Sequence, residues 1–138
     1  MNRYVLDTSA LFALIENEEG VSEVETLLLQ AIEGQHELVI SIVSEIEVFY
    51  ISLREQGEVI AHERLGLLND LPVKHELLDV NLIRIIGELK AGYSLSFADC
   101  CIAGLAREIG AVLVHKDPEF EAIEPLVAQY KLPYKPKA

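Results

Sequence analysis

The sequence is poor in cysteine and lacks long apolar runs, and both shortages exclude classes of protein. Its two cysteines, Cys100 and Cys101, are neighbours within a helical pattern, which argues against a disulfide framework or a CxxC metal site. We expect both to be buried thiols in a reducing cytoplasm. No apolar run is long enough to cross a bilayer, and the first residues lack the pattern of a signal peptide, so we expect a cytoplasmic protein.

Basic residues are also scarce. The chain has 11 Lys and Arg against 23 Asp and Glu, which gives a formal net charge of −12. Such a chain is not expected to hold nucleic acid by counterion release from a broad basic face. The acidic surface favours cationic partners instead, either divalent metal ions or a basic protein segment. If the substrate is itself a polyanion, metal ions must bridge the repulsion.

Short apolar runs alternate with longer helical patterns along the 138 residues, which suffice for one domain. The patterns predict strands at 4–7, 37–40, 73–77 and 111–114, with an edge strand within 126–134. They predict helices at 10–16, 21–32, 42–56, 58–71, 80–91 and 96–109, and a helical turn at 119–122. We therefore predict a single α/β domain over 1–138, a three-layer α/β/α sandwich with a central, mainly parallel sheet. Its core should span about 3–127, followed by a basic tail rich in Pro and Lys at about 131–138.

Three acids stand where catalytic groups collect in such a fold. Asp7 closes the first strand, Asp117 follows the strand at 111–114, and Asp99 lies in the first turn of the helix before that strand. Strand carboxyl ends and the helix starts that follow them gather on one edge of a parallel sheet, so these acids should meet there. Each acid also has a purely structural interpretation. Asp7 would cap a helix, Asp99 would complete a capping box with Ser96, and Asp117 would form a turn.

A fourth acid should come from the helix at 42–56. Glu45 and Glu47 flank its apolar stripe on opposite sides, and periodicity alone does not choose between them. The histidines outside the strand ends show no metal-ligand spacing and are expected to be surface or half-buried residues; they are His36, His62 and His75.

Four motifs in this order resemble those of a PIN domain, of the small single-domain kind found as the toxin of VapBC toxin–antitoxin pairs. They are Tyr4-Val5-Leu6-Asp7-Thr8-Ser9-Ala10-Leu11, Ile40-Ser41 leading to Glu47-Val48-Phe49-Tyr50, Leu95-Ser96-Phe97-Ala98-Asp99, and Val112-Leu113-Val114-His115-Lys116-Asp117-Pro118-Glu119-Phe120. The resemblance runs from Tyr4 to about Ile123. It implies a metal-dependent ribonuclease whose acidic quartet falls here on Asp7, Glu47, Asp99 and Asp117, and it thereby favours Glu47 over Glu45.

Such a quartet suits Mg²⁺ or Mn²⁺, because carboxylate oxygens are the hard ligands that these ions prefer. One or two ions would generate hydroxide from water and neutralise the phosphate. Two like charges near 4 Å repel by about 4 kcal/mol at an effective dielectric constant of about 20, so the cluster itself predicts a cation or a raised pKa. The leading hypothesis is therefore an endoribonuclease that hydrolyses RNA phosphodiester bonds.

Ser9 and His115 are the remaining site candidates. The family often uses the position of Ser9 to bind a metal-bound water or a phosphate, and helix capping is the alternative. His115 stands where the family commonly has Thr or Ser, so its imidazole would hold a water or phosphate oxygen instead, or it would mark weakened activity. The alternative function is accordingly a catalytically weak PIN-fold module that binds RNA or protein. A haloacid-dehalogenase-type phosphatase is disfavoured, since it needs a second Asp where Ser9 stands.

The resemblance implies an RNA substrate, a homodimer and a cognate antitoxin. The helices support the antitoxin independently, because they carry more apolar residues than one face needs, and an acidic pocket would accept an inserted Arg. We therefore expect a partner with a basic amphipathic segment. The apolar residues concerned are Leu11, Phe12, Ile15, Phe49, Tyr50, Leu53, Ile60 and Leu68.

Overall fold

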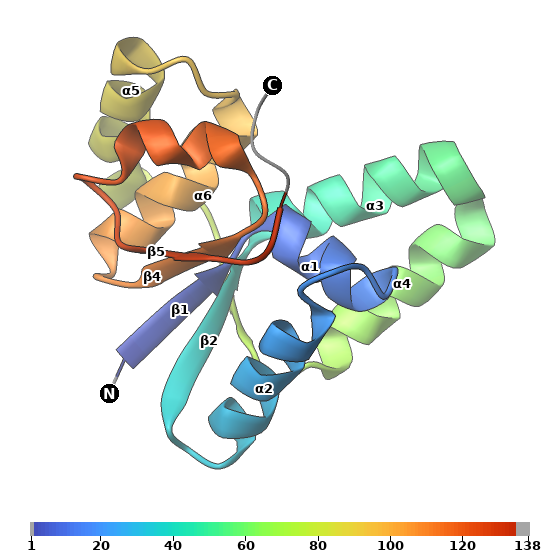
Figure 1. Cartoon of the computed structure of the whole chain (residues 1–138). Helices are drawn as coiled ribbons and strands as arrows, with labels where there is room; N and C mark the ends of the chain where they lie inside the picture. The colour runs from blue at the N-terminus through green and yellow to red at the C-terminus, as the bar shows by residue number, and fades with distance from the viewer. Residues whose placement is uncertain (1, 135–138) are drawn as a thin grey trace.

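The computed structural model describes residues 2–134 and contains a five-stranded parallel sheet between two layers of helices (Figure 1). The strands are β1 Asn2–Leu6, β2 His36–Ser41, β3 Lys74–Glu76, β4 Val112–His115 and β5 Gln129–Lys131. Their order is β3-β2-β1-β4-β5, and every neighbouring pair is parallel. The predicted three-layer architecture is confirmed. Lys135 and Lys137 of the predicted basic tail lie outside the described residues.

Helices cover both faces of the sheet, with α5 and α6 on one side and α1 to α4 on the other (Figure 1). The α-helices are α1 Thr8–Ile15, α2 Val21–Ile32, α3 Ile42–Gln56, α4 Glu58–Asp70, α5 Ile83–Gly92 and α6 Phe97–Glu108. Two short 3₁₀ helices complete the elements, η1 Val80–Leu82 and η2 Pro118–Ile123. Within residues 2–134, the helices lack the combined length and apolar character that crossing a membrane requires.

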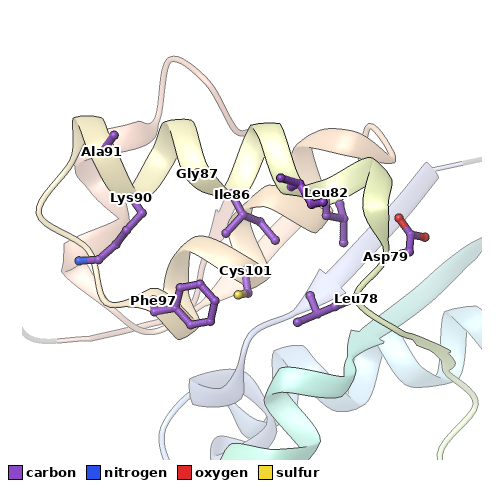
Figure 2. A pocket seen from close by; sticks show the side chains of 10 residues that line it. Leu78, Asp79, Leu82, Ile86, Gly87, Lys90, Ala91, Phe97 and Cys101 are labelled. Carbon is purple, nitrogen blue, oxygen red and sulfur yellow. The ribbon is translucent and has the colours of Figure 1, made fainter.

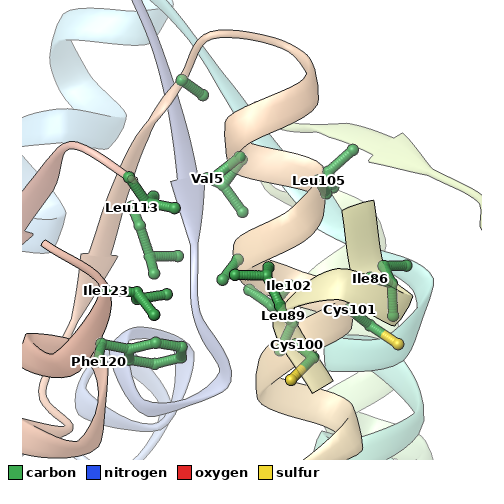
Figure 3. Close-up of a cluster of buried hydrophobic side chains, with 14 of the residues drawn as sticks. Val5, Ile86, Leu89, Cys100, Cys101, Ile102, Leu105, Leu113, Phe120 and Ile123 are labelled. Carbon is green, nitrogen blue, oxygen red and sulfur yellow. The ribbon is translucent and has the colours of Figure 1, made fainter. Parts of the chain in front are cut away.

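Successive residues of β1 supply two separate cores. Val5 packs into the cluster beneath α5 and α6, and Leu6 packs into the cluster beneath α1 to α4. Both side chains are fully buried, as expected for a central parallel strand that is covered on both faces. Figure 3 shows the first core, which includes Val5 of β1, Ile102 of α6 and Phe120 of η2. The predicted burial of the two cysteines is confirmed, since both lie in this core.

The structure differs from the predicted elements in two places. The single helix expected at 80–91 is divided into η1 and α5, and Asp79 caps η1 by accepting a hydrogen bond from the backbone N–H of Asn81 (2.8 Å). Apolar spacing over so few residues does not separate a 3₁₀ turn from an α-helical one. The edge strand forms as predicted but is short, and Leu132 after it is buried, with its N–H donating to the carbonyl of His115 (2.8 Å). The chain therefore packs against the core at least as far as Leu132.

Three neighbouring strands end at one edge of the sheet, and a polar side chain caps the helix that follows each. Asp7 caps α1 after β1, Ser41 caps α3 after β2, and Asp117 caps η2 after β4. The two acids accept hydrogen bonds from backbone N–H groups two residues ahead. Local capping and the parallel register therefore bring both acids to the carboxyl edge of the sheet.

Candidate active site

Asp7 is the most deeply buried acid at this edge, with only 3% of its surface exposed. Its Oδ2 accepts hydrogen bonds from the N–H of Ser9 (3.0 Å) and from the Ser9 hydroxyl, and its own N–H donates to the carbonyl of Val114 in β4 (2.9 Å). The pKa of Asp7 is raised from 3.8 to about 7, chiefly by burial. The charges of Asp99 and Glu47 contribute to the rise, and the two hydrogen bonds from Ser9 oppose it. Asp7 therefore caps the helix and also lies in a strongly negative environment.

Asp99 lies at the start of α6, which Ser96 caps by accepting a hydrogen bond from the N–H of Asp99 (3.1 Å). Partial burial raises the pKa of Asp99 from 3.8 to about 6. The charge of Asp117 is the next cause of the rise, and Glu47 and Glu119 add to it. The Ser96 half of the predicted capping box is thus present, and the charges of Asp117 and Glu47 act on the carboxylate of Asp99.

The two acids of α3 have different surroundings. Glu47 accepts a hydrogen bond from the hydroxyl of Thr8 (2.7 Å), and its charge raises the pKa of both Asp7 and Asp99. Glu45 instead pairs with Nδ1 of His75 in β3 (3.1 Å). The choice that periodicity left open is therefore made by tertiary contacts, which place Glu47 beside the other acids.

Thr8 is a site residue that sequence reasoning missed. Its hydroxyl donates to Glu47 and also lies 3.1 Å from the hydroxyl of Ser44. Thr8 therefore links the first turn of α1 with helix α3. The available signal was its place between Asp7 and Ser9 in the first motif.

Ser9 connects the ends of β1 and β4. Its hydroxyl donates to Asp7 and accepts a hydrogen bond from the N–H of Lys116 (2.9 Å). The hydroxyl hydrogen is therefore committed to Asp7, and the structure places Ser9 as a support for that acid. The helix cap proposed for Ser9 is wrong, because Asp7 is the residue that caps α1.

His115 is buried and hydrogen-bonded within the protein. Its side chain is fully buried, its Nδ1 accepts a hydrogen bond from the N–H of Asp117 (3.0 Å), and its Nε2 lies 2.8 Å from Oε1 of Gln129. Burial lowers the pKa of His115, which keeps the ring neutral. Protein groups therefore engage both nitrogens, in place of the water or phosphate oxygen that the sequence led us to expect.

The other histidines vary in burial. His36 was expected to be exposed or half-buried but is buried, with its Nε2 2.9 Å from the carbonyl oxygen of Leu27, because this face of β2 packs against α2. His62 is exposed and His75 is half-buried, as predicted.

The acids at this edge have no basic partner in the part of the chain that the structure describes, since none of its ion pairs includes Asp7, Glu47, Asp99 or Asp117. As the side chains lie, no three acidic, His or Cys groups among residues 2–134 surround a common point closely enough to hold a metal ion. A cation would have to draw the carboxylates together. The donor chemistry fits Mg²⁺ or Mn²⁺, because all four groups offer hard oxygen ligands and their charges are otherwise uncompensated.

Comparisons with known proteins agree with this architecture. The sequence pattern of the PIN domain family matches residues 4–125. No curated protein has a matching sequence.

Three solved structures illustrate the likeness in fold. The VapBC2 structure from Rickettsia felis bound to a promoter DNA fragment has a TM-score of 0.79 at 19% identity, covering 95% of this chain and 99% of that chain. VapBC-1 from nontypeable Haemophilus influenzae has a TM-score of 0.72 at 22% identity, covering 94% and 97%. VapC20 from Mycobacterium tuberculosis, described as a Sarcin-Ricin loop cleaving toxin, has a TM-score of 0.68 at 18% identity, covering 86% and 93%. At these identities, the likeness establishes a shared fold.

Proposed function

This chain belongs to the PIN domain family, and from that premise we propose that it is a divalent-metal-dependent endoribonuclease that hydrolyses RNA phosphodiester bonds. One observation carries the proposal. Asp7, Glu47, Asp99 and Asp117 gather at one edge of the sheet, where the charges of Asp99 and Glu47 raise the pKa of Asp7 and the charge of Asp117 raises the pKa of Asp99. None of the four forms an ion pair among the described residues. Mg²⁺ or Mn²⁺ is the kind of ion that such a group of carboxylates binds.

Each acid has a distinct part in the proposed site. Asp7 is the buried anchor, fixed by Ser9 at the start of α1, while Asp99 and Asp117 are partly exposed and would complete the ligand set. Glu47, which accepts a hydrogen bond from Thr8, would complete the set of carboxylates around the metal ion. When bound, the metal ion would activate a water for attack on phosphorus and neutralise charge on the phosphate. The acids would thus hold the cation that lets a protein of net charge −12 approach a polyanion.

A matched pair of variants on α6 tests the proposal. Asp99→Asn removes one charge from the site but keeps the side-chain size and the backbone hydrogen bond to Ser96. Glu108→Gln removes one charge from the exposed far end of the same helix. We expect the wild type and Glu108→Gln to cleave RNA with Mn²⁺ and not with a chelator, and Asp99→Asn to lose roughly a hundredfold or more of the rate, since even outer-shell changes cost about 10- to 100-fold.

Equal cleavage by the wild type and Asp99→Asn would overturn the assigned site. Calorimetric titration with Mn²⁺ distinguishes the proposed nuclease from the alternative function. A wild type that binds RNA but no Mn²⁺ would favour the catalytically weak binding module.

We further propose that the protein is the toxin of a toxin–antitoxin pair and that its antitoxin binds beside the acids. The similar structures from R. felis and H. influenzae are named as VapBC. Next to the site lies a pocket of about 350 Å³ lined by apolar side chains, Lys116 and three glutamates. Glu16 and Glu18 pair with Arg64 and Lys116, so Glu55 is the lining acid that suits a cationic side chain with an aliphatic stem. Its lining residues are Ser9, Phe12, Glu16, Glu18, Ile51, Glu55 and Lys116.

The apolar surface available to such an antitoxin is smaller than the sequence suggested. Leu11 and Leu68 are fully buried in the core beneath α1 to α4 and are not available to a partner. Tyr50 and Leu53 of α3 are exposed. The antitoxin segment is therefore expected to run along α3, with a basic residue in the acidic pocket.

We propose that a homodimer forms through a different surface, the apolar groove between α5 and α6 (Figure 2). The groove has a volume of about 540 Å³, and Phe97 and Ile83 on it are 61% and 70% exposed. Its only charged lining residues are Asp79 and Lys90. Copies that each carry a net charge of −12 repel one another, so a contact between them requires a surface of low net charge such as this one.

A further inference from the structure

Gln129, His115 and Asp117 form a hydrogen-bonded chain that runs from the edge strand β5 to the last acid of the site. Nε2 of Gln129 donates to the carbonyl oxygen of Phe120 (2.7 Å), which leaves Oε1 of Gln129 facing Nε2 of His115 (2.8 Å). Across the ring, Nδ1 of His115 accepts from the N–H of Asp117 (3.0 Å). Each link has one donor and one acceptor only if His115 is neutral with its proton on Nε2.

We infer that Gln129 is a positioning residue, which fixes the tautomer and orientation of His115 so that the ring holds the backbone N–H of Asp117. The inference rests on the proposed function, since the position of Asp117 matters for catalysis only if the acids bind a cation. The side chain of Asp117 is anchored separately, because its Oδ1 accepts from the N–H of Glu119 (2.9 Å). The two anchors together fix the backbone and the carboxylate of this acid.

Packing makes the orientation of the ring depend on Gln129. The buried ring of His115 contacts the ring of Phe120, with centroids 4.9 Å apart at 59°, and stacks on Tyr134, with centroids 6.0 Å apart at 27°. These contacts favour the plane of the ring but do not distinguish one nitrogen from the other. Without the acceptor of Gln129, the proton could move to Nδ1, where it would point at the N–H of Asp117. Two N–H donors, on His115 and Asp117, would then face each other, and their repulsion would displace Asp117.

Variants at position 115 separate this role from simple packing. His115→Phe keeps the ring between its aromatic neighbours but removes both nitrogens. His115→Asn places Oδ1 where Nδ1 stands and accepts from the N–H of Asp117 in an Asx turn, without help from Gln129. Gln129→Leu leaves the ring in place but removes the acceptor for Nε2, together with the donor to the carbonyl oxygen of Phe120.

The first measurement is the Mn²⁺ dissociation constant, by calorimetry on the full chain. We expect a rise of about 10- to 100-fold for His115→Phe and about tenfold for Gln129→Leu, but less than about threefold for His115→Asn, by analogy with other residues that orient metal ligands. Adding Gln129→Leu to His115→Asn should not change the Mn²⁺ dissociation constant any further. Wild-type affinity in His115→Phe, or an equal loss from Gln129→Leu in both backgrounds, would overturn the inference.

The second measurement is the protonation of the ring by ¹⁵N NMR without metal. We expect a neutral ring protonated on Nε2 in the wild type and a mixture of tautomers in Gln129→Leu; a wild-type ring protonated on Nδ1 would overturn the inference. The two proposals fail differently. A wild type that binds no Mn²⁺ overturns the proposed function and the inference with it, whereas a wild type and a His115→Phe variant that bind Mn²⁺ equally overturn the inference alone.

Discussion

Removing the charge of Asp7 should stabilise the metal-free protein at neutral pH and remove its response to metal. Asp7 is 3% exposed and has no basic partner among the described residues, and Asp7→Asn keeps a side chain that caps helices as well as Asp does. The substitution therefore changes mainly the charge. An acid that binds a cation should behave in this way, because its ionised form is unfavourable until the cation arrives.

The size of the effect follows from the raised pKa of Asp7. A carboxyl whose pKa is raised on folding stabilises the fold fully below its ordinary pKa of 3.8, and this contribution is lost as the pH rises through the folded pKa of about 7. Between pH 5 and pH 8, the wild type should lose about 3 kcal/mol from this group alone. The Asn amide adds a constant cost of about 1–3 kcal/mol if its hydrogens find no acceptor, and that cost does not vary with pH.

The assay is denaturant unfolding of the wild type and Asp7→Asn at pH 5 and pH 8 with a chelator present. Asp7→Asn should gain about 3 kcal/mol relative to the wild type on going from pH 5 to pH 8, which is a change in Tm on the order of 10 °C for a domain of this size. Asp70→Asn, at the exposed end of α4, is the matched control, and its stability should vary with pH as that of the wild type does. Mn²⁺ at about 100 times its dissociation constant should stabilise the wild type by about 3 kcal/mol and leave Asp7→Asn unchanged.

Two outcomes would refute this reasoning separately. If Asp7→Asn and the wild type show the same pH dependence, the carboxyl of Asp7 is not destabilised by burial. If Mn²⁺ stabilises both proteins equally, Asp7 is not a ligand of the metal ion.

Three further substitutions test other parts of the structure. Glu47→Gln should weaken Mn²⁺ binding by about tenfold or more in calorimetry, whereas Glu45→Gln on the same helix should not, because Glu45 pairs with a histidine away from the acids; equal effects would contradict the choice between them. Phe97→Asp should convert a dimer to a monomer in sedimentation analysis, and an unchanged dimer would locate the interface elsewhere. Gly104→Ala should lower Tm, because its Cβ would lie 2.9 Å from a side-chain carbon of α5 and overpacking costs about 1–3 kcal/mol; Gly87→Ala, which meets open space, should not lower it.

Local sequence signals were enough to place three of the four acids. Asp7, Asp99 and Asp117 each follow from a strand end or a capping pattern of a few residues, and the structure has these caps. The choice between Glu45 and Glu47 could not be made from local signals of this kind. It depends on Thr8 and His75, which come from distant parts of the chain, and helical periodicity holds no information about either contact.

The role of His115 also depends on contacts that the neighbouring sequence does not reveal. A polar residue next to a predicted catalytic acid is reasonably expected to face the substrate. The short strand β5 changes this, because it pairs with β4, and its Gln129 receives the hydrogen bond from the ring. A three-residue edge strand gives only a weak sequence pattern, so the burial of His115 could not be predicted from the residues around it.

The groups that hold the acids share one chemical property, which is that they are neutral. Hydroxyls of Ser9 and Thr8 donate to Asp7 and Glu47, and a backbone N–H donates to Asp117. Neutral donors fix the direction of a carboxylate but leave most of its charge uncompensated, whereas a Lys or Arg in their place would lower the pKa of the acid and neutralise it. This arrangement keeps the fold less stable than it could be and leaves the negative charge free for a cation. A basic residue of the proposed antitoxin would have two effects at once, because its charge would relieve the repulsion among the acids and exclude the metal ion from the same place.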